Sequence, residues 1–388
     1  MVVTMILLGV ILVHPARSQS ERLPRQSNPL EMTTSDPLLP QSPLERPLTP
    51  QERSSLEISL NDLNTQATAQ FRVGNLDQAF EIWYRELRLR RVLGGLAEVE
   101  ALGRVAEFAW KEGRREDLQN ITQRLEMIQK QTTEGVSPEL LTALGQAYEN
   151  ARSPRQAAQV YTRLLETVQQ TGNLDTQVSL LQKIGQLHLA WFNYTDAATA
   201  YEQLLSVAQS RQGNVNIATY LQQLAYIYDR ASQPENAIEA KEQLIQEYQR
   251  QGQRAPIPAV KISLGKNYNT LQQPEKASQH YQEAFEIAWS LQQYNYASEA
   301  LQHLANLYST YEQPNATLNI YQELIKVQQY SYDHYGLMNT YDAMGRIFLK
   351  QQNYPQALVV YRKALELAQS LNYQEYYYSS QVKLLERQ

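Results

Sequence analysis

The sequence predicts an all-α protein, a superhelical solenoid built from about eight helix-turn-helix repeats. Three observations predict this fold. Small residues recur with a period of 40, rings and alanines follow them at fixed offsets, and prolines recur in one phase. Self-similarity at such a period is typical of folds that grow by stacking units. A length of 388 residues therefore does not imply several separate domains.

Each unit contains four marked positions. The first is small, at Gly145, Gly185, Ala225, Gly265, Ala305 and Gly345. Three residues later stands a ring, at Tyr148, His188, Tyr228, Tyr268, Tyr308 and Phe348. The third position, twelve residues after the small one, holds Ala157, Ala197, Ala237, Ala277, Thr317 and Ala357. Four residues further on are Tyr161, Tyr201, Lys241, Tyr281, Tyr321 and Tyr361. Because positions i, i+3 and i+4 share one helix face, each unit contains two amphipathic helices.

The residue types fit this packing. A small residue lets the neighbouring helix approach closely, and the tyrosine rings fill the remaining volume with their hydroxyls free to stay in water. Pro154, Pro234, Pro274 and Pro314 share the phase in which a helix begins, where proline's missing N–H does no harm. Glycines at 172, 213 and 252 are expected to end the second helices.

These residues resemble the signature of the tetratricopeptide-repeat (TPR) family, most clearly over 139–367. Two looser units precede that range, one with Ala67 and Trp83, the other with Gly103 and a second helix displaced by an insertion near Glu112-Gly113. A capping helix is expected over 373–386, so the array spans 56–388. The family's usual period is about 34 residues, and we expect the extra length mostly in the second helix.

The N-terminal region differs from the repeats. Residues 1–18 consist of thirteen apolar or uncharged residues followed by His14-Pro15 and a small-x-small site, which predicts a cleaved signal peptide. A short membrane anchor or a buried helix is the alternative. Residues 19–55 carry seven prolines among Ser, Gln and Arg, which predicts an extended linker, either a spacer or a docking segment.

Composition and motifs narrow the function. A net charge of -5 without basic runs argues against nucleic-acid binding, and the absence of cysteine excludes disulfides and thiolate chemistry. The sequence has no phosphate-binding loop, nucleophile elbow or His-Glu-x-x-His motif, so we expect no enzyme activity. His188 occupies a ring position and is expected in the core, while Asp333-His334 is a candidate for a weak metal site.

A ligand groove is implied by the TPR resemblance, because the family exposes the residue after each small position on its concave wall. Here that column and its flanks comprise Gln146, Gln182, Gln186, Gln222, Tyr226, Asp229, Lys266, Asn269, Gln302, Asn306, Asp342 and Arg346. Amide side chains can hydrogen-bond an extended peptide backbone. Lys266 or Arg346 could hold a carboxylate, so a tail or an acidic segment is the expected ligand.

The sequence therefore predicts an exported scaffold, in the periplasm or a similar compartment, that binds a partner protein. The layout also resembles the periplasmic processing-associated TPR proteins of cyanobacteria, which implies a role in early photosystem II assembly. That resemblance implies binding of the tail of a reaction-centre core protein, with delivery of manganese, and membrane association through partners alone. A peptide-sensing regulator and a non-catalytic subunit of an envelope enzyme remain as alternatives.

Overall fold

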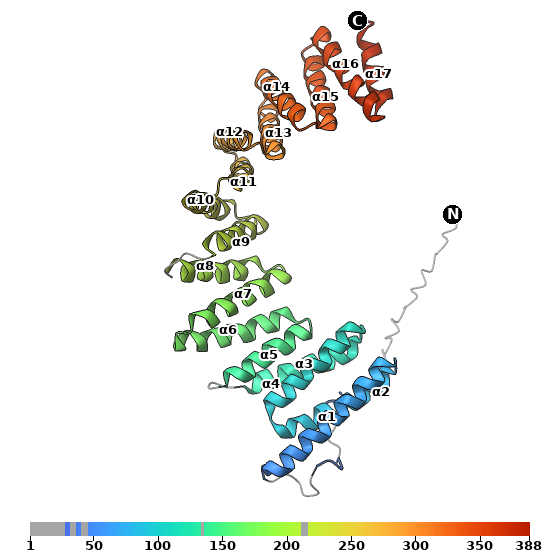
Figure 1. The fold of residues 1–388 in the computed structure, drawn as a ribbon, viewed down its shortest axis with the longest axis vertical. Coiled ribbons are helices and arrows are strands. Elements are labelled where there is room, and N and C mark those ends of the chain that lie inside the picture. The colour runs from blue at the N-terminus through green and yellow to red at the C-terminus, as the bar shows by residue number, and fades with distance from the viewer. Residues whose placement is uncertain (1–27, 32–35, 40–45, 133–135, 211–215) are drawn as a thin grey trace, which may run out of the picture. The chain divides into compact units, whose positions relative to one another are not determined.

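The computed structural model describes residues 28–31, 36–39, 46–132, 136–210 and 216–388, and the predicted signal peptide lies outside them. Within these ranges the chain forms seventeen α-helices, one 3₁₀ helix and no strand (Figure 1). This confirms the predicted all-α repeat fold. The chain divides into two compact units, Met1–Ser153 and Pro154–Gln388. In the described part of the chain, no helix is both long and apolar enough to span a bilayer.

The described residues of unit 1 form five α-helices. They are α1 (Pro50–Arg72), α2 (Leu76–Arg90), α3 (Gly95–Lys111), α4 (Arg115–Gln131) and α5 (Pro138–Asn150), with the 3₁₀ helix η1 (Arg91–Leu93) after α2. Helix α1 begins earlier than the expected residue 56, because Thr49 and Glu52 form a reciprocal capping box and Pro50 occupies the first helical position.

The segment expected as a linker contributes to unit 1 wherever it is described. Leu30 is fully buried, and its carbonyl accepts a hydrogen bond from Arg91. Arg85 binds the Asp36 carboxylate with two nitrogens, at 2.8 and 3.0 Å, and this holds the pKa of Asp36 below its usual value. Leu38, Leu39 and Leu48 pack against the apolar cluster that includes the buried leucines of α1. This differs from the spacer expectation because these leucines cover the otherwise exposed apolar face of the first repeat.

The second repeat also corrects the sequence prediction. Helix α4 is not displaced at Glu112-Gly113, since a three-residue turn joins it to α3 as in the other hairpins. Its small position is Ala106, 39 residues before Gly145. The signature was missed because Leu118 and Thr122 stand in α4 where other repeats have Ala and an aromatic ring. With a spacing of 39 residues, this repeat contains no insertion relative to the 40-residue period.

Unit 2 is a series of successive helices (Figure 1). They are α6 (Pro154–Thr171), α7 (Leu174–Ala190), α8 (Tyr194–Ser210), α9 (Ile217–Arg230), α10 (Pro234–Arg250), α11 (Ile257–Thr270), α12 (Pro274–Ser290), α13 (Tyr294–Thr310), α14 (Pro314–Tyr330), α15 (His334–Lys350), α16 (Tyr354–Leu371) and α17 (Glu375–Leu385). Helix α17 is the expected cap, and it buries Tyr378, Val382 and Leu385 against the array.

The 40-residue period divides evenly in the last repeats. Helices α13, α14 and α15 each contain 17 residues, joined by three-residue turns. The extra length is thus shared by both helices there, which corrects the expectation that it lies mostly in the second. The middle residue of such turns has a positive φ although it is not glycine, as at Gln272 (55°) and Gln352 (56°). Gly172 and Gly252 do end second helices with positive φ, and Gly213 lies outside the described residues.

Glycines at the small position leave space for a tyrosine ring of the second helix, which packs directly against the glycine. A Cβ on Gly185 would lie 2.7 Å from the Tyr201 ring, and one on Gly345 would lie 2.6 Å from the Tyr361 ring. Contacts this short do not occur in proteins, so glycine is required where the tyrosine sixteen residues later is fully inserted. Where Ala305 stands instead, the matching Tyr321 is only half-buried.

The tyrosine hydroxyls of the first helices are hydrogen-bonded within the protein, which corrects the expectation that they stay in water. Tyr268 donates to Glu242 at 3.1 Å, and Tyr228 donates to Glu202. Each acceptor lies 26 residues earlier, on the second helix of the preceding repeat. Burial, followed by the bond to Glu202, raises the pKa of Tyr228. These bonds connect successive repeats in unit 2.

Candidate functional site

The predicted column is exposed throughout. In unit 2 its members lie on the first helices of successive repeats, α7, α9, α11, α13 and α15. They are Gln186, Tyr226, Lys266, Asn306 and Arg346, and the flanking Asn269 and Gln302 are exposed as well. Gln146 is also exposed, on α5 of unit 1. Exposure makes these side chains accessible to a ligand, but which of them bind one stays a prediction.

Several flanking residues are already engaged in holding the array together. Gln182 on α7 donates to the Tyr220 hydroxyl at 3.1 Å, and Gln222 on α9 donates to the Tyr248 hydroxyl. These amides therefore have a structural partner, which the sequence pattern did not indicate.

Asp229 is exposed, but its carboxylate pairs with a buried lysine. Lys241, which is 4% exposed, stands in the slot that other repeats fill with tyrosine, and its ammonium lies 2.7 Å from the Asp229 carboxylate. Asn267 on α11 donates to the same carboxylate at 2.9 Å. Burial lowers the pKa of Lys241, and the bond to Asp229 opposes that shift. Asp229 thus compensates a buried charge.

The two predicted cationic residues each have an acidic neighbour. Lys266 lies 2.9 Å from Glu299 of the next first helix, and Arg346 lies 3.0 Å from Asp342 one turn earlier. Asp342 is itself buried and accepts a hydrogen bond from Tyr377 of the capping helix. A carboxylate ligand would have to compete with these partners, so the arrangement does not favour an acidic segment.

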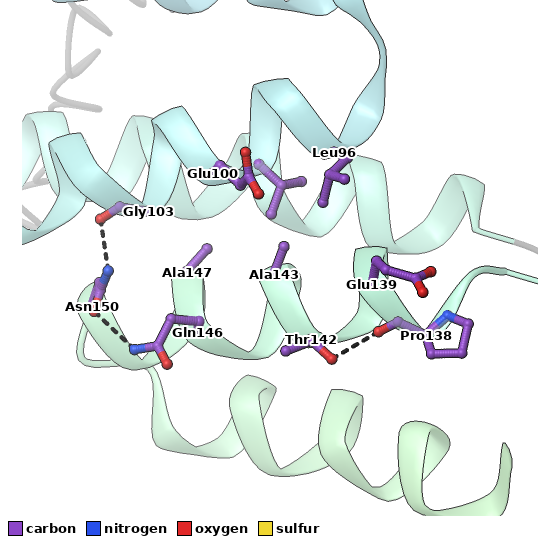
Figure 2. Close-up of a pocket in the computed structure, with 11 residues that line it drawn as sticks. Leu96, Glu100, Gly103, Pro138, Glu139, Thr142, Ala143, Gln146, Ala147 and Asn150 are labelled. Atoms are coloured by element: carbon purple, nitrogen blue, oxygen red, sulfur yellow. Dashed lines mark hydrogen bonds between the residues drawn. The ribbon is translucent and has the colours of Figure 1, made fainter. Parts of the chain in front are cut away.

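Unit 1 contains a groove between α3 and α5 with a volume of about 630 Å³ (Figure 2). That volume is within the ~300–1,000 Å³ common for ligand sites. Its residues are Leu96, Val99, Glu100, Gly103, Pro138, Glu139, Thr142, Ala143, Gln146, Ala147 and Asn150. Gln146 is thus the one predicted site residue that lines this groove.

The groove exists because α3 and α5 touch at one end. A Cβ on Gly103 would lie 2.9 Å from the Cα of Ala147, so only glycine permits this approach. Asn150 donates to the Gly103 carbonyl at 3.2 Å and accepts from the Gln146 amide at 3.3 Å (Figure 2). The contact closes one end of the groove and fixes two amide side chains there.

Two glutamates border the groove. Glu100 projects from α3 and Glu139 from the first turn of α5 (Figure 2). Both are exposed, and within the described residues neither forms an ion pair. Sequence reasoning missed both. The available signal was a glutamate shortly before each of the small residues Gly103 and Gly145.

The histidines are packed against rings. His280 stacks on Tyr268 with a centroid distance of 5.1 Å, and His303 stacks on Tyr281 at 5.3 Å. His188, expected in the core, is largely buried beside Trp191. Burial lowers the pKa of all three.

Manganese favours several oxygen or imidazole ligands around one point. Among the described residues no three His, Asp or Glu side chains gather in this way, and Asp333 instead caps α15 through the Gly336 N–H. The donor set in the described part of the chain therefore does not fit a manganese site.

Comparison with known proteins agrees with the fold. The helix pairs, the small position and the inserted tyrosine define a helical-repeat protein of the tetratricopeptide type. Residues 140–175 and 340–372 match the sequence profile described as tetratricopeptide repeat. A comparison with curated protein sequences gave no significant match.

Several solved structures resemble the chain at low identity. The C-terminal part of a TPR repeat-containing protein from Cytophaga hutchinsonii is 13% identical, with 68% of this chain and 95% of that chain covered and a TM-score of 0.42. Aspartyl phosphate phosphatase F from Bacillus subtilis is 15% identical, with 74% and 79% covered and a TM-score of 0.41. A signal transduction ATPase with a TPR sensor, from Pyrococcus horikoshii, is 17% identical, with 87% and 50% covered and a TM-score of 0.39. These identities and TM-scores describe structural similarity only.

Proposed function

We propose that the chain is an exported, non-catalytic scaffold that binds an extended segment of a partner protein and thereby assembles it into a complex. The observation that carries this proposal is the open groove between α3 and α5, lined by small residues and two fixed amides. An extended segment needs apolar contact for its side chains and hydrogen bonds for its backbone, and this groove supplies both.

The binding activity is tested without assuming a partner. The purified chain is used to select from a displayed library of random dodecapeptides, and the selected peptides are titrated calorimetrically. We expect enrichment of sequences that bind with micromolar dissociation constants. Ala143→Leu, which fills the groove, should weaken them. A library that yields no binding peptide contradicts the scaffold proposal.

Export is the second part of the proposal, and it is supported by the apolar segment of residues 1–18. We expect the protein in its native cells to begin at Gln19 and to fractionate outside the cytoplasm. Mass spectrometry of the N-terminal peptide measures this. An N-terminus that still contains residues 1–18 contradicts cleavage there.

A narrower proposal, a role in photosystem II assembly with a reaction-centre tail as ligand, rests on the layout resemblance. Its test is co-purification of that core protein with the chain, with bound metal measured by elemental analysis. Manganese delivery is not part of the proposal, because the described residues do not provide its ligands.

A further inference from the structure

The chemistry of the groove in unit 1 suggests what kind of segment it binds. Its lining includes the small residues Gly103, Ala143 and Ala147 and the aliphatic residues Leu96 and Val99. Leu96 remains 40% exposed, so apolar surface is available to a ligand. Burying an aliphatic side chain against such a surface is favourable in proportion to the area covered.

The charges around this apolar strip have one sign. Glu100 and Glu139 both border the groove (Figure 2), and neither has a cationic partner in the described residues. Two other glutamates of the array are already paired, because Glu98 binds Arg91 and Arg124 and Glu299 binds Lys266. The groove acids are therefore available to pair with cations on a ligand.

The closed end of the groove adds a polar contact. Asn150 is held by the Gly103 carbonyl and in turn holds the Gln146 amide. Because the Gln146 side chain carries both a donor group and an acceptor, it can exchange hydrogen bonds with one peptide group of an extended backbone.

We propose that the groove between α3 and α5 binds a partner segment with a basic residue, then aliphatic residues, then a second basic residue. The aliphatic side chains lie between the helices, and the flanking Lys or Arg side chains pair with Glu100 and Glu139. This inference rests on the proposed scaffold function and specifies its ligand. It replaces the acidic segment expected from Lys266 and Arg346, whose charges already have partners.

Three fluorescent octapeptides test the proposal on the full chain, each flanked by Gly-Ser and Ser-Gly. Their cores are Lys-Leu-Leu-Lys, Glu-Leu-Leu-Glu and Lys-Ser-Ser-Lys, and binding is measured by fluorescence anisotropy at low and moderate salt. We expect the first peptide to bind at least about tenfold more tightly than either of the others, since it alone has both the aliphatic and the basic residues.

Paired variants locate the interaction. Glu100→Gln with Glu139→Gln should weaken the Lys-Leu-Leu-Lys peptide about three- to tenfold and reduce its salt dependence. The matched control, Glu81→Gln with Glu116→Gln, removes two exposed glutamates of unit 1 outside the groove and should change affinity less than about twofold. Ala143→Leu should weaken binding at least tenfold by occupying the groove, with unchanged circular dichroism as the check on folding.

The outcomes separate this inference from the scaffold function. Equal affinity for the Glu-Leu-Leu-Glu peptide, or equal losses in the groove and control variants, would overturn the basic-aliphatic ligand. The same conclusion follows if library-selected peptides bind in the groove while the Lys-Leu-Leu-Lys peptide does not, and the scaffold function then stands. If neither the library nor the defined peptides bind, both proposals fail.

Discussion

Different interactions stabilise the interior of each of the two units. In unit 1, buried carboxylates bind arginines across helices: Glu86 is fully buried and lies 2.8 Å from Arg104. In unit 2, tyrosine rings inserted over glycine and hydroxyls bonded to the preceding repeat perform that role. The regular unit repeats one contact many times. The irregular unit departs from the repeat signature, and there the open groove is found.

The comparison predicts its largest effect at the buried carboxylate of unit 1. Glu86→Ala should destabilise that unit by about 3 kcal/mol, because Arg90 and Arg104 lose their common partner. Hydrogen exchange should accelerate in α2 and α3. Glu81→Ala, an exposed position on the same helix, should change stability by no more than about 0.5 kcal/mol. Equal effects of the two substitutions would contradict a role for the buried pair.

In unit 2, Gly265→Ala should destabilise the protein by about 2 kcal/mol, because the new methyl group would collide with the Tyr281 ring. Helix propensity alone predicts the opposite sign, a gain of about 1 kcal/mol. The sign of the change in urea unfolding therefore decides between the two. Ala305 is the equivalent position in a repeat whose tyrosine is half-buried. Ala305→Gly should therefore lower the stability only by the difference in helix propensity between alanine and glycine, about 1 kcal/mol.

Stability of unit 2 should depend on pH near neutrality. Burial lowers the folded-state pKa of His280 and His303 below the unfolded value of 6.5. Lys261 and Lys276 act in the same direction on His280 and Lys266 does so on His303, while Glu242, Glu283 and Glu299 oppose them. The unfolded state therefore binds more protons between the folded pKa and 6.5, so stability is complete above pH 6.5 and falls as the solution is acidified.

The measurement is urea unfolding at several pH values from 7.5 to 5.5, with amide hydrogen exchange in α11–α14 as the probe of unfolding. The double variant His280→Phe and His303→Phe keeps the ring stacking and should reduce this dependence, leaving the part due to His188, whose pKa is also lowered by burial. An unchanged slope in the double variant would show that other groups cause it.

The smallest effect is expected at the turns. Gln272 has a φ of 55°, a left-handed backbone conformation that is unfavourable for residues other than glycine. Gln272→Gly should therefore stabilise the protein by about 1 kcal/mol. Unit 1 supplies the reverse test at Gly113, with a φ of 64° and open space around it, where Gly113→Ala should destabilise by a similar amount. Thermal unfolding measures both, and changes of the same sign would contradict the turn argument.

The sequence predicted the repeat well because the recurring small and aromatic residues are the ones that pack against each other between the helices. Gly265 and Tyr281 are recognisable as partners from spacing alone, since the same glycine–tyrosine contact recurs at Gly185 and Gly345. The sequence prediction misplaced helix α4 because its residues depart from the signature. Leu118 and Thr122 are compatible with a helix but are not the alanine and aromatic residue that mark the other repeats. The packing of Leu30 and the Asp36–Arg85 pair could not be predicted, because contacts far apart in sequence have no periodic pattern.

The binding surface was predicted less well than the fold. Exposure of the column followed from the repeat phase, but the partners of Asp229 and Lys266 did not, since both belong to other helices. The groove depends on Gly103 approaching Ala147, a contact outside the repeat rule. Glu100 and Glu139 become significant only when that contact places them around one groove.

The central claim is that an extended basic-aliphatic segment lies in the groove between α3 and α5. The most direct test places a photoreactive benzoylphenylalanine at Thr142, in the groove, or at Glu81, outside it, and irradiates each with the Lys-Leu-Leu-Lys peptide. We predict strong crosslinking from position 142, competed by unlabelled peptide, and background levels from position 81. Equal crosslinking from the two positions, or none from position 142 to a peptide that binds, would contradict the claim.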